Sequence, residues 1–300
     1  MKLARPEWEV SAYEVFAEPI LAELERYHEL VATADIIVSQ PIHDGYRGRD
    51  DLSLSYVRRS AKPGATILVF PSMHFEGQLI DCRSLSIRAH GMDYHNVLLV
   101  HLVAAGLHAA SAFRILAQTD LYPPQFVASE MRRSIEEARR REIIDAVDVP
   151  FVPFLEAFTT RVQLFHTTNH PYRPALVWIT RRILHKLGIP LSIEVPPPDG
   201  PEPIPFPHIP LPPSVKRLLT GPDASLAGWT TPQDEVYHLP NEVMGILEYY
   251  ECAARNLASY KAIELIQFLA ESRARSFLAR LARVRPDLPG IGFWRRFAGD

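Results

Sequence analysis

The chain has 300 residues, 47% of them hydrophobic, which is enough for one large globular domain or two smaller ones. A formal charge of −3 and a pI near 6.5 argue against a protein whose whole surface binds nucleic acid or anionic lipid. The two cysteines fit neither a disulfide framework nor a zinc motif, so a reducing cytoplasm and no metal are predicted. No run reaches the roughly eighteen apolar residues of a membrane span.

The first part of the chain predicts an α/β layer. Residues 14–33 carry apolar side chains at helical spacing and predict an amphipathic helix. Two β-branched runs, at residues 34–41 and 65–72, predict strands, and the segment 52–62 between them predicts a helix. A strand, a helix and a strand in succession favour parallel pairing of the two strands.

The remainder of the chain predicts mainly helices, at residues 94–106, 123–147, about 171–187 with Gly188 just past its end, and two more within 240–284. The predicted fold class is therefore α/β and predominantly helical, with a small parallel sheet near the N-terminus followed by a helical remainder. The predicted domains are an α/β core with the site loops, a proline-rich connector, and a helical region packed on the same domain, over residues 1–194, 195–213 and 214–300.

Two histidines and an asparagine precede the helix predicted to begin at Pro171. The segment is LFHTTNHPYRP, and His170 is the expected N-cap because a proline disfavours α geometry in the residue before it. Helix N-termini attract anions, and a histidine there can act as a general base or donate to a phosphate. Two alternatives are that Asn169 and His170 only cap the helix, or that His166 and His170 bind zinc, which Pro171 disfavours.

A polar loop, SQPIHDGYRGRDD at residues 39–51, follows the first predicted strand. Ligands of α/β sheets bind at the carboxyl ends of strands, which is where this loop is expected to lie. Gln40, Tyr46 and Arg47 are candidate ligand contacts, and the guanidinium of Arg47 suits a phosphate or a carboxylate. A solvated loop with local salt bridges is the alternative.

Further candidates follow the second strand and lie on the longest helix. His74 and Glu76, in the loop at residues 71–81, should open on the same sheet edge as Arg47, although a capped turn explains them equally well. Glu142 continues the apolar stripe of the helix at 123–147, so it needs an arginine or a helix end as its partner. No sequence feature marks Cys82 as a reactive thiolate.

Three segments together resemble the WcbI-type polysaccharide-biosynthesis family of bacterial capsule assembly. They are ADIIVSQPIHDGYR, RRREIIDAV and LFHTTNHP, and the resemblance covers about residues 8–260. It implies a mostly helical α/β fold that binds coenzyme A or acetyl-CoA and is thought to acetylate a hydroxyl of a sugar or polysaccharide precursor. The site residues that it implies are Gln40, Tyr46, Arg47, Glu142, His166, Asn169 and His170. His74 is a further candidate because it lies in the loop that follows the second predicted strand.

Family members usually begin with a strand that ends in Gly-Asn-Cys-Gln, and no residue before Cys82 is a cysteine here. The chain is therefore expected to start after that strand. The alternatives to a transferase are a ligand-binding or scaffolding relative without catalysis, and a coenzyme-independent esterase, for which no Gly-x-Ser-x-Gly elbow is present. The C-terminal GFWRRFAGD is predicted to pack on the domain, with a membrane-surface contact as the weaker reading.

Overall fold

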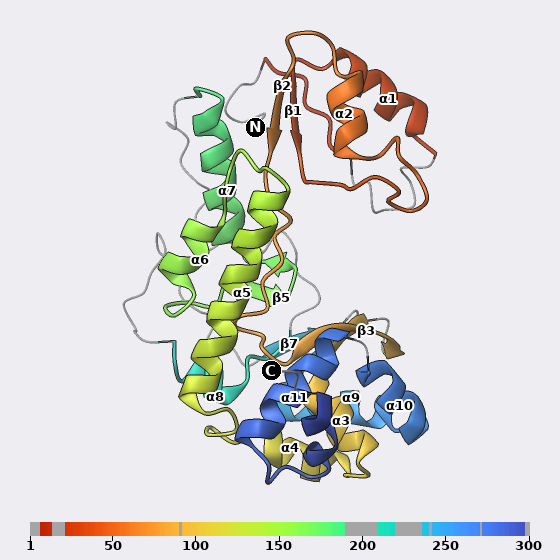
Figure 1. Cartoon of the computed structure of the whole chain (residues 1–300), viewed down its shortest axis with the longest axis vertical. Coiled ribbons are helices and arrows are strands. Elements are labelled where there is room, and N and C mark those ends of the chain that lie inside the picture. The colour runs from red at the N-terminus through yellow and green to blue at the C-terminus, as the bar shows by residue number, and fades with distance from the viewer. Residues whose placement is uncertain are drawn as a thin grey trace. The chain divides into compact units, whose positions relative to one another are not determined.

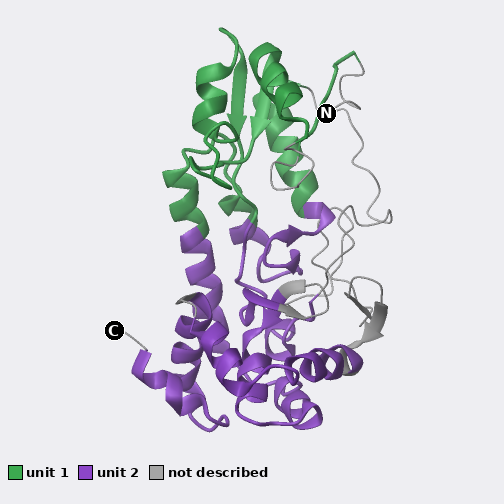
Figure 2. Ribbon diagram, turned by 90° about the vertical axis from the view of Figure 1, so that its right-hand side faces the viewer, with its two compact units in different colours: residues 1–73, 138–154, 175–197 green, residues 74–137, 155–174, 198–300 purple. Residues whose placement is uncertain are grey.

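The computed structural model describes residues 7–13, 22–89, 92–189, 209–219, 236–239, 242–270 and 272–297. The chain divides into two compact units, shown in different colours in Figure 2. Unit 1 comprises residues 1–73, 138–154 and 175–197, and unit 2 comprises residues 74–137, 155–174 and 198–300.

Unit 1 holds the predicted parallel sheet. Strand β1 (Ile36–Ser39) pairs with strand β2 (Thr66–Val69), with Ile36 opposite Thr66 and Ser39 opposite Val69. Helix α2 (Leu54–Ser60) lies between the two strands in the sequence, and helix α1 (Leu24–Thr33) precedes them (Figure 1). This register confirms the predicted parallel pairing. The segment with α2 supplies the crossover that two parallel strands need.

Local sequence explains where these elements begin and what they bury. The hydroxyl of Ser53 accepts a hydrogen bond from the Tyr56 N–H and caps α2. Facing side chains of the two helices and of the loop before α2 form a small apolar core of Tyr27, Val31, Leu52 and Val57. The helix predicted for residues 14–33 is observed from Leu24 onward; residues 14–21 lie outside the described part of the chain.

A segment from later in the chain extends strand β2. The carboxylate of Asp148 accepts a hydrogen bond from the Val69 N–H, and the N–H groups of Asp148 and Val149 both donate to the Val69 carbonyl oxygen. Three long-range bonds thus satisfy the end of a strand that pairs with one other strand among the described residues. The helices around this segment are α5 (Pro124–Ile144), α6 (Val152–Phe158) and α7 (Arg173–Lys186), and Gly188 follows α7 at φ +67°, as its predicted C-terminal role requires.

Unit 2 is built around α3 (Val97–Ala104), whose residues 97–102 are all buried, as the apolar sequence predicts. Its N-cap Asn96 accepts a hydrogen bond from the Leu99 N–H. Around α3 lie α4 (Ala109–Leu116), α9 (Ile246–Leu257), α10 (Ala262–Leu269) and α11 (Ser272–Val284), followed by the 3₁₀ helix η2 (Ile291–Phe297) (Figure 1). Helix α8 (Pro213–Lys216) begins at the end of the proline-rich segment predicted at 195–213, and residues 195–208 of that segment lie outside the described chain.

Three short antiparallel hairpins depart from the prediction that strands end with the first part of the chain. They are β3 (Cys82–Ala89) with β4 (Met92–Asn96), β5 (Phe165–Thr167) with β6 (His170–Pro171), and β7 (Val236–Leu239) with β8 (Glu242–Gly245). The first was missed although Leu85 and Ile87 are buried and Ser84 and Ser86 exposed, the alternation of a half-buried strand. The apolar run of α3 begins directly after β4 and obscured this pattern.

The second of the two helices predicted within residues 240–284 was expected to run unbroken over residues 262–281. This is wrong, because α10 ends at Leu269 and α11 begins at Ser272. Both helices pack against α3, and the side chain of Arg273, in the first turn of α11, is 63% exposed. The helical spacing of apolar residues continues on both sides of the interruption and did not reveal it.

The C-terminal aromatic segment packs within unit 2. Ile291 and Trp294 of η2 are buried, and the indole N–H of Trp294 donates to Nδ1 of His101 at 3.1 Å. Arg295 donates to the carbonyl oxygen of Ala282 in α11. None of the helices described here has the length and apolar character needed to cross a membrane.

Candidate functional site

The candidate site residues fall into two groups, one in each compact unit. Unit 2 contains His74, His166, Asn169 and His170, and unit 1 contains Gln40, Tyr46, Arg47 and Glu142. Within each unit the surrounding contacts define what these side chains can do.

His170 does not cap a helix, contrary to the prediction. His170 and Pro171 form strand β6 opposite β5, and helix α7 begins at Arg173. The N–H of Tyr172 continues the ladder by donating to the Leu164 carbonyl oxygen at 2.9 Å. The backbone N–H of Tyr172 is therefore hydrogen-bonded within the hairpin and is not a free N–H at the start of a helix. The prediction of an anion site at a helix start next to His170 is therefore wrong.

Thr167 and Asn169 form the polar surroundings of His170. The Thr167 hydroxyl donates to Oδ1 of Asn169 at 3.1 Å and lies 2.5 Å from Nδ1 of His170. Thr167 is fully buried, whereas Asn169 is exposed and His170 is half-buried. The hairpin therefore holds the imidazole by one nitrogen at the edge of the protein surface.

Burial and a neighbouring imidazole favour the neutral form of His170. Desolvation lowers the pKa of His170, and the charge that His166 would carry lowers it further. The ring of Tyr94 meets His170 edge-on at 5.5 Å, and the buried His166 lies with its ring centroid 3.6 Å from that of Tyr172. A neutral imidazole at neutral pH can accept a proton, as a general base requires.

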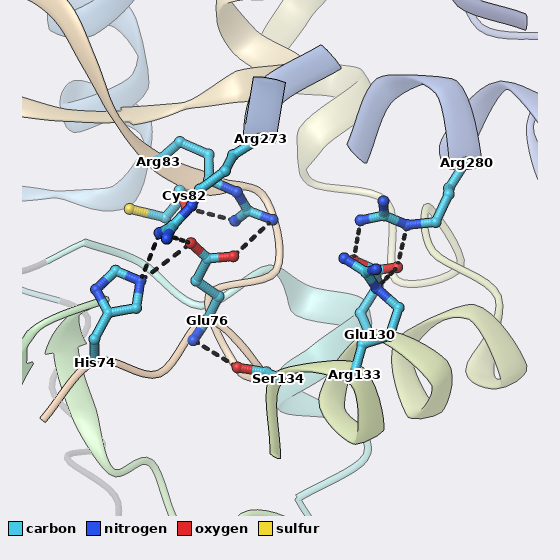
Figure 3. Close-up of polar contacts among 9 residues, drawn as sticks. All are labelled: His74, Glu76, Cys82, Arg83, Glu130, Arg133, Ser134, Arg273 and Arg280. Carbon is cyan, nitrogen blue, oxygen red and sulfur yellow. Dashed lines mark hydrogen bonds and ion pairs between the residues drawn. The ribbon is translucent and has the colours of Figure 1, made fainter. Parts of the chain in front are cut away.

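His74 belongs to a charged cluster around Glu76 (Figure 3). One carboxylate oxygen of Glu76 lies 3.1 Å from Nε2 of His74 and 3.3 Å from the exposed Arg273, and the other lies 3.2 Å from the buried Arg83. The N–H of Glu76 donates to the Ser134 hydroxyl at 2.9 Å. His74 is thus oriented by a carboxylate that two arginines also bind.

One backbone contact brings this cluster beside the β5–β6 hairpin. The N–H of Phe75, between His74 and Glu76, donates to the carbonyl oxygen of Thr168 at 2.6 Å. The rings of Phe75 and Phe165 also meet at 5.8 Å. All four predicted residues in unit 2, His74, His166, Asn169 and His170, therefore lie on two segments that are joined directly.

The arginines make the pKa of Glu76 a source of pH-dependent stability. Burial alone would raise this pKa, but the hydrogen bond from His74 and the charges of Arg83, His74 and Arg273 outweigh it and lower the pKa from its usual 4.5 to about 2. Such a lowering stabilises the folded form by about 3 kcal/mol when Glu76 is ionised in both states. The stabilisation is present above pH 4.5 and is lost as the pH falls towards 2.

We therefore expect the Glu76→Gln variant to lose less stability on acidification than the natural chain. Denaturant unfolding between pH 7 and pH 3, followed by circular dichroism, measures the difference between the two curves. At pH 7 the variant is also less stable, because Arg83 is left buried without its carboxylate. Parallel curves at all pH values would contradict the assignment of this titration to Glu76.

In unit 1 the polar loop at residues 39–51 is exposed and tightly turned. Gly45, Arg47 and Gly48 all have positive φ, of 74°, 54° and 74°, so three of four successive residues adopt the left-handed region. Tyr46 is 37% exposed and bridges to Arg49, whereas Gln40 is half-buried at the end of β1. The loop presents the ring of Tyr46 and the guanidinium of Arg47 from an unusual backbone turn.

Glu142 is engaged by a helix end, one of the two partners expected for it. Its Oε1 accepts hydrogen bonds from the N–H groups of Phe151 and Val152, at 2.6 and 3.0 Å, where α6 begins. Burial raises the pKa of Glu142, and these two bonds oppose that rise. Three residues on, Asp145 lies 3.7 Å from His43 of the polar loop. Glu142 thus fixes the segment beside this loop.

Cys82 cannot serve as a thiolate nucleophile. It is fully buried, and the pKa of its thiol is raised, mainly by burial and by the neighbouring Asp81.

The sequence prediction missed Thr167, Arg83 and Arg273. Thr167 stands in the T-x-N-H pattern and could have been found there, whereas the arginines join the site only through the hairpin β3–β4 and the break before α11. Within the described chain, no group of three His, Cys, Asp or Glu side chains could hold a metal ion.

The fold and these two groups define a mostly helical α/β protein with a histidine-containing hairpin. The family model of the polysaccharide biosynthesis enzyme WcbI matches residues 4–192, so the chain belongs to that family. No curated protein sequence matches the chain.

One solved structure shares the fold, with a TM-score of 0.75 at 20% identity, over 98% of this chain and 91% of the other. It is described as WcbI, a novel polysaccharide biosynthesis enzyme, in a native form without a disulfide bond between coenzyme A and one of its cysteines.

Proposed function

We propose that this protein is an acyl-CoA-dependent O-acetyltransferase that acts on a hydroxyl group of a sugar or polysaccharide precursor during capsule or surface polysaccharide synthesis. The family supports a role in polysaccharide biosynthesis, and the description of the similar structure supports coenzyme A as the ligand class. The observation that carries the proposal is the half-buried imidazole of His170, which Thr167 contacts at Nδ1 and whose pKa is lowered by burial, so that the ring can take a proton.

The proposed reaction assigns separate tasks to the candidate residues of unit 2 and to those of unit 1. The acceptor oxygen attacks the thioester carbonyl while His170 takes the hydroxyl proton; the C–S bond then breaks, His170 returns that proton to the departing sulfur, and the coenzyme leaves as its thiol. Asn169 orients the imidazole through Thr167, and His166 lowers its pKa. In unit 1, Gln40, Tyr46 and Arg47 are the proposed coenzyme contacts, and Glu142 holds the segment beside their loop. His74, fixed by Glu76, completes the proposed contacts.

Calorimetric titration with coenzyme A and with acetyl-CoA tests the ligand class. We expect Arg47→Ala to weaken binding by about tenfold or more, because a charge-assisted contact to phosphate contributes about 1.5–3 kcal/mol. The alanine inherits the positive φ of Arg47 without additional strain, so the loop is kept. Arg26→Ala is the matched control, since Arg26 is an exposed arginine of the same unit that pairs with Glu29. Absence of binding at millimolar ligand, or equal binding by Arg47→Ala, contradicts the assignment.

A second candidate is a family member that binds the coenzyme without transferring its acyl group. The buried Cys82 with its raised pKa favours it, because that thiol cannot form an acyl-enzyme. Direct transfer with His170 as base needs no thiol. An assay for thiol release from acetyl-CoA with added sugar acceptors separates the two candidates: binding without release identifies the non-catalytic form.

A further inference from the structure

We infer that Thr167 is a positioning residue that fixes the tautomer of His170, so that the ring is protonated at Nδ1 and presents a bare Nε2. The catalytic consequence of this inference rests on the proposed function. Its structural content, the location of one proton, is independent of that function.

The first step is the count of hydrogens on the Thr167 hydroxyl. A hydroxyl carries one hydrogen and can accept two more bonds. The Thr167 hydroxyl donates its hydrogen to Oδ1 of Asn169 at 3.1 Å, and its oxygen also lies 2.5 Å from Nδ1 of His170. With the Asn169 amide placed so that Oδ1 faces the hydroxyl, the hydrogen of Thr167 is used there and its oxygen accepts from Nδ1. A neutral imidazole protonated at Nδ1 has its lone pair at Nε2.

The second step is the environment of Nε2. Among the residues that the structure describes, Thr167 is the only side chain hydrogen-bonded to His170. The groups that face the ring are Tyr94 of β4, whose ring meets it edge-on, and His166 of β5, whose charge would oppose a second proton. No carboxylate is among these facing groups. The imidazole is therefore held neutral, with one nitrogen engaged and the other available to a ligand.

The third step is the rigidity of this arrangement. Thr167 is fully buried, and its neighbour Thr168 is fixed through its carbonyl oxygen by the Phe75 N–H. The carbonyl oxygen of His166 accepts from the Ile209 N–H at 3.0 Å, which holds the other side of Thr167. A hydroxyl on such a backbone cannot turn away from the imidazole without a change in the hairpin. Only a side chain with a hydroxyl at this position can give the same control of the ring.

Nitrogen-15 NMR of the full chain, labelled in its histidine rings, measures the tautomer directly. We expect the His170 ring of the natural protein to show a protonated Nδ1 and a bare Nε2 at a pH where it is neutral. In Thr167→Val the Nδ1 partner is lost and the proton distributes over both nitrogens, whereas Thr167→Ser restores the natural spectrum. Thr159→Val is the control, because Thr159 has a buried hydroxyl without a partner in the described chain.

Transfer assays add the second readout. Thr167→Val should lower kcat by about tenfold or more, a part of the 10²–10⁴-fold that a general base contributes, with little change in KM for acetyl-CoA, and Thr167→Ser should recover most of it. A protonated Nε2 in the natural protein overturns the inference, even if Thr167→Val fails to fold. An unchanged tautomer in Thr167→Val does the same. The expected tautomer in a protein that releases no thiol from acetyl-CoA contradicts the proposed function and leaves the role of Thr167 standing.

Discussion

Replacing His170 by glutamine should lower the rate of acetyl transfer by about 10²–10⁴-fold, the usual contribution of a general base. Glutamine can still hydrogen-bond to Thr167 but cannot take a proton at the position of Nε2, so the hairpin is kept and the chemistry is lost. The affinity for acetyl-CoA, measured by calorimetry, should stay within about twofold if the residue acts on the acceptor proton alone. Rate and affinity together therefore separate catalysis from binding.

The pH profile gives the same residue a second signature. A base must be deprotonated, and the pKa of His170 is lowered by burial and by His166. Transfer should therefore persist below pH 6.5, the ordinary pKa of histidine, and decline only as the pH falls through the lowered value. His108→Gln is the matched control, because His108 is an exposed histidine of unit 2 with no cap bond to α4. Natural rates in His170→Gln would remove this residue from the mechanism.

The elements that the sequence predicted correctly are those whose signals are local. The strands β1 and β2 are short β-branched runs, α3 is apolar on all sides, and Gly188 marks the end of α7 by the one conformation that glycine adopts freely. The α10–α11 break gave no local signal, because apolar residues keep their helical spacing on both sides of it.

The site shows the same division. Residue types and order selected His166, Asn169 and His170 as candidates, and their roles stay a prediction, but the proline signal for a helix start gave the wrong local structure. Pro171 lacks an N–H and is compatible with the first position of a helix, yet it is equally compatible with an edge strand, and the pairing of Tyr172 with Leu164 decided between them. Long-range contacts such as that of Glu76 with Arg273 leave no periodic trace in the sequence.

Breaking the buried ion pair between Glu130 and Arg280 should cause a large loss of stability in unit 2. Glu130 is 5% exposed and receives two hydrogen bonds from the guanidinium of Arg280, at 2.6 and 2.7 Å (Figure 3). Arg280→Ala leaves that carboxylate buried with only Arg133, 3.5 Å away and largely exposed. Removal of one partner of a buried pair costs about 3–5 kcal/mol, and Arg133 places the expected loss near the lower value, about 3 kcal/mol.

Denaturant unfolding followed by circular dichroism and by tryptophan fluorescence measures this loss, and two further variants show its origin. The double replacement Glu130→Leu/Arg280→Leu should recover much of the stability, because an apolar pair of similar volume leaves no buried charge behind. Arg26→Ala, which breaks the exposed pair with Glu29 in unit 1, should change the free energy of unfolding by less than about 1 kcal/mol. A loss as small as this in Arg280→Ala would mean that water reaches the Glu130 carboxylate, and the pair would then orient α5 and α11 without stabilising them.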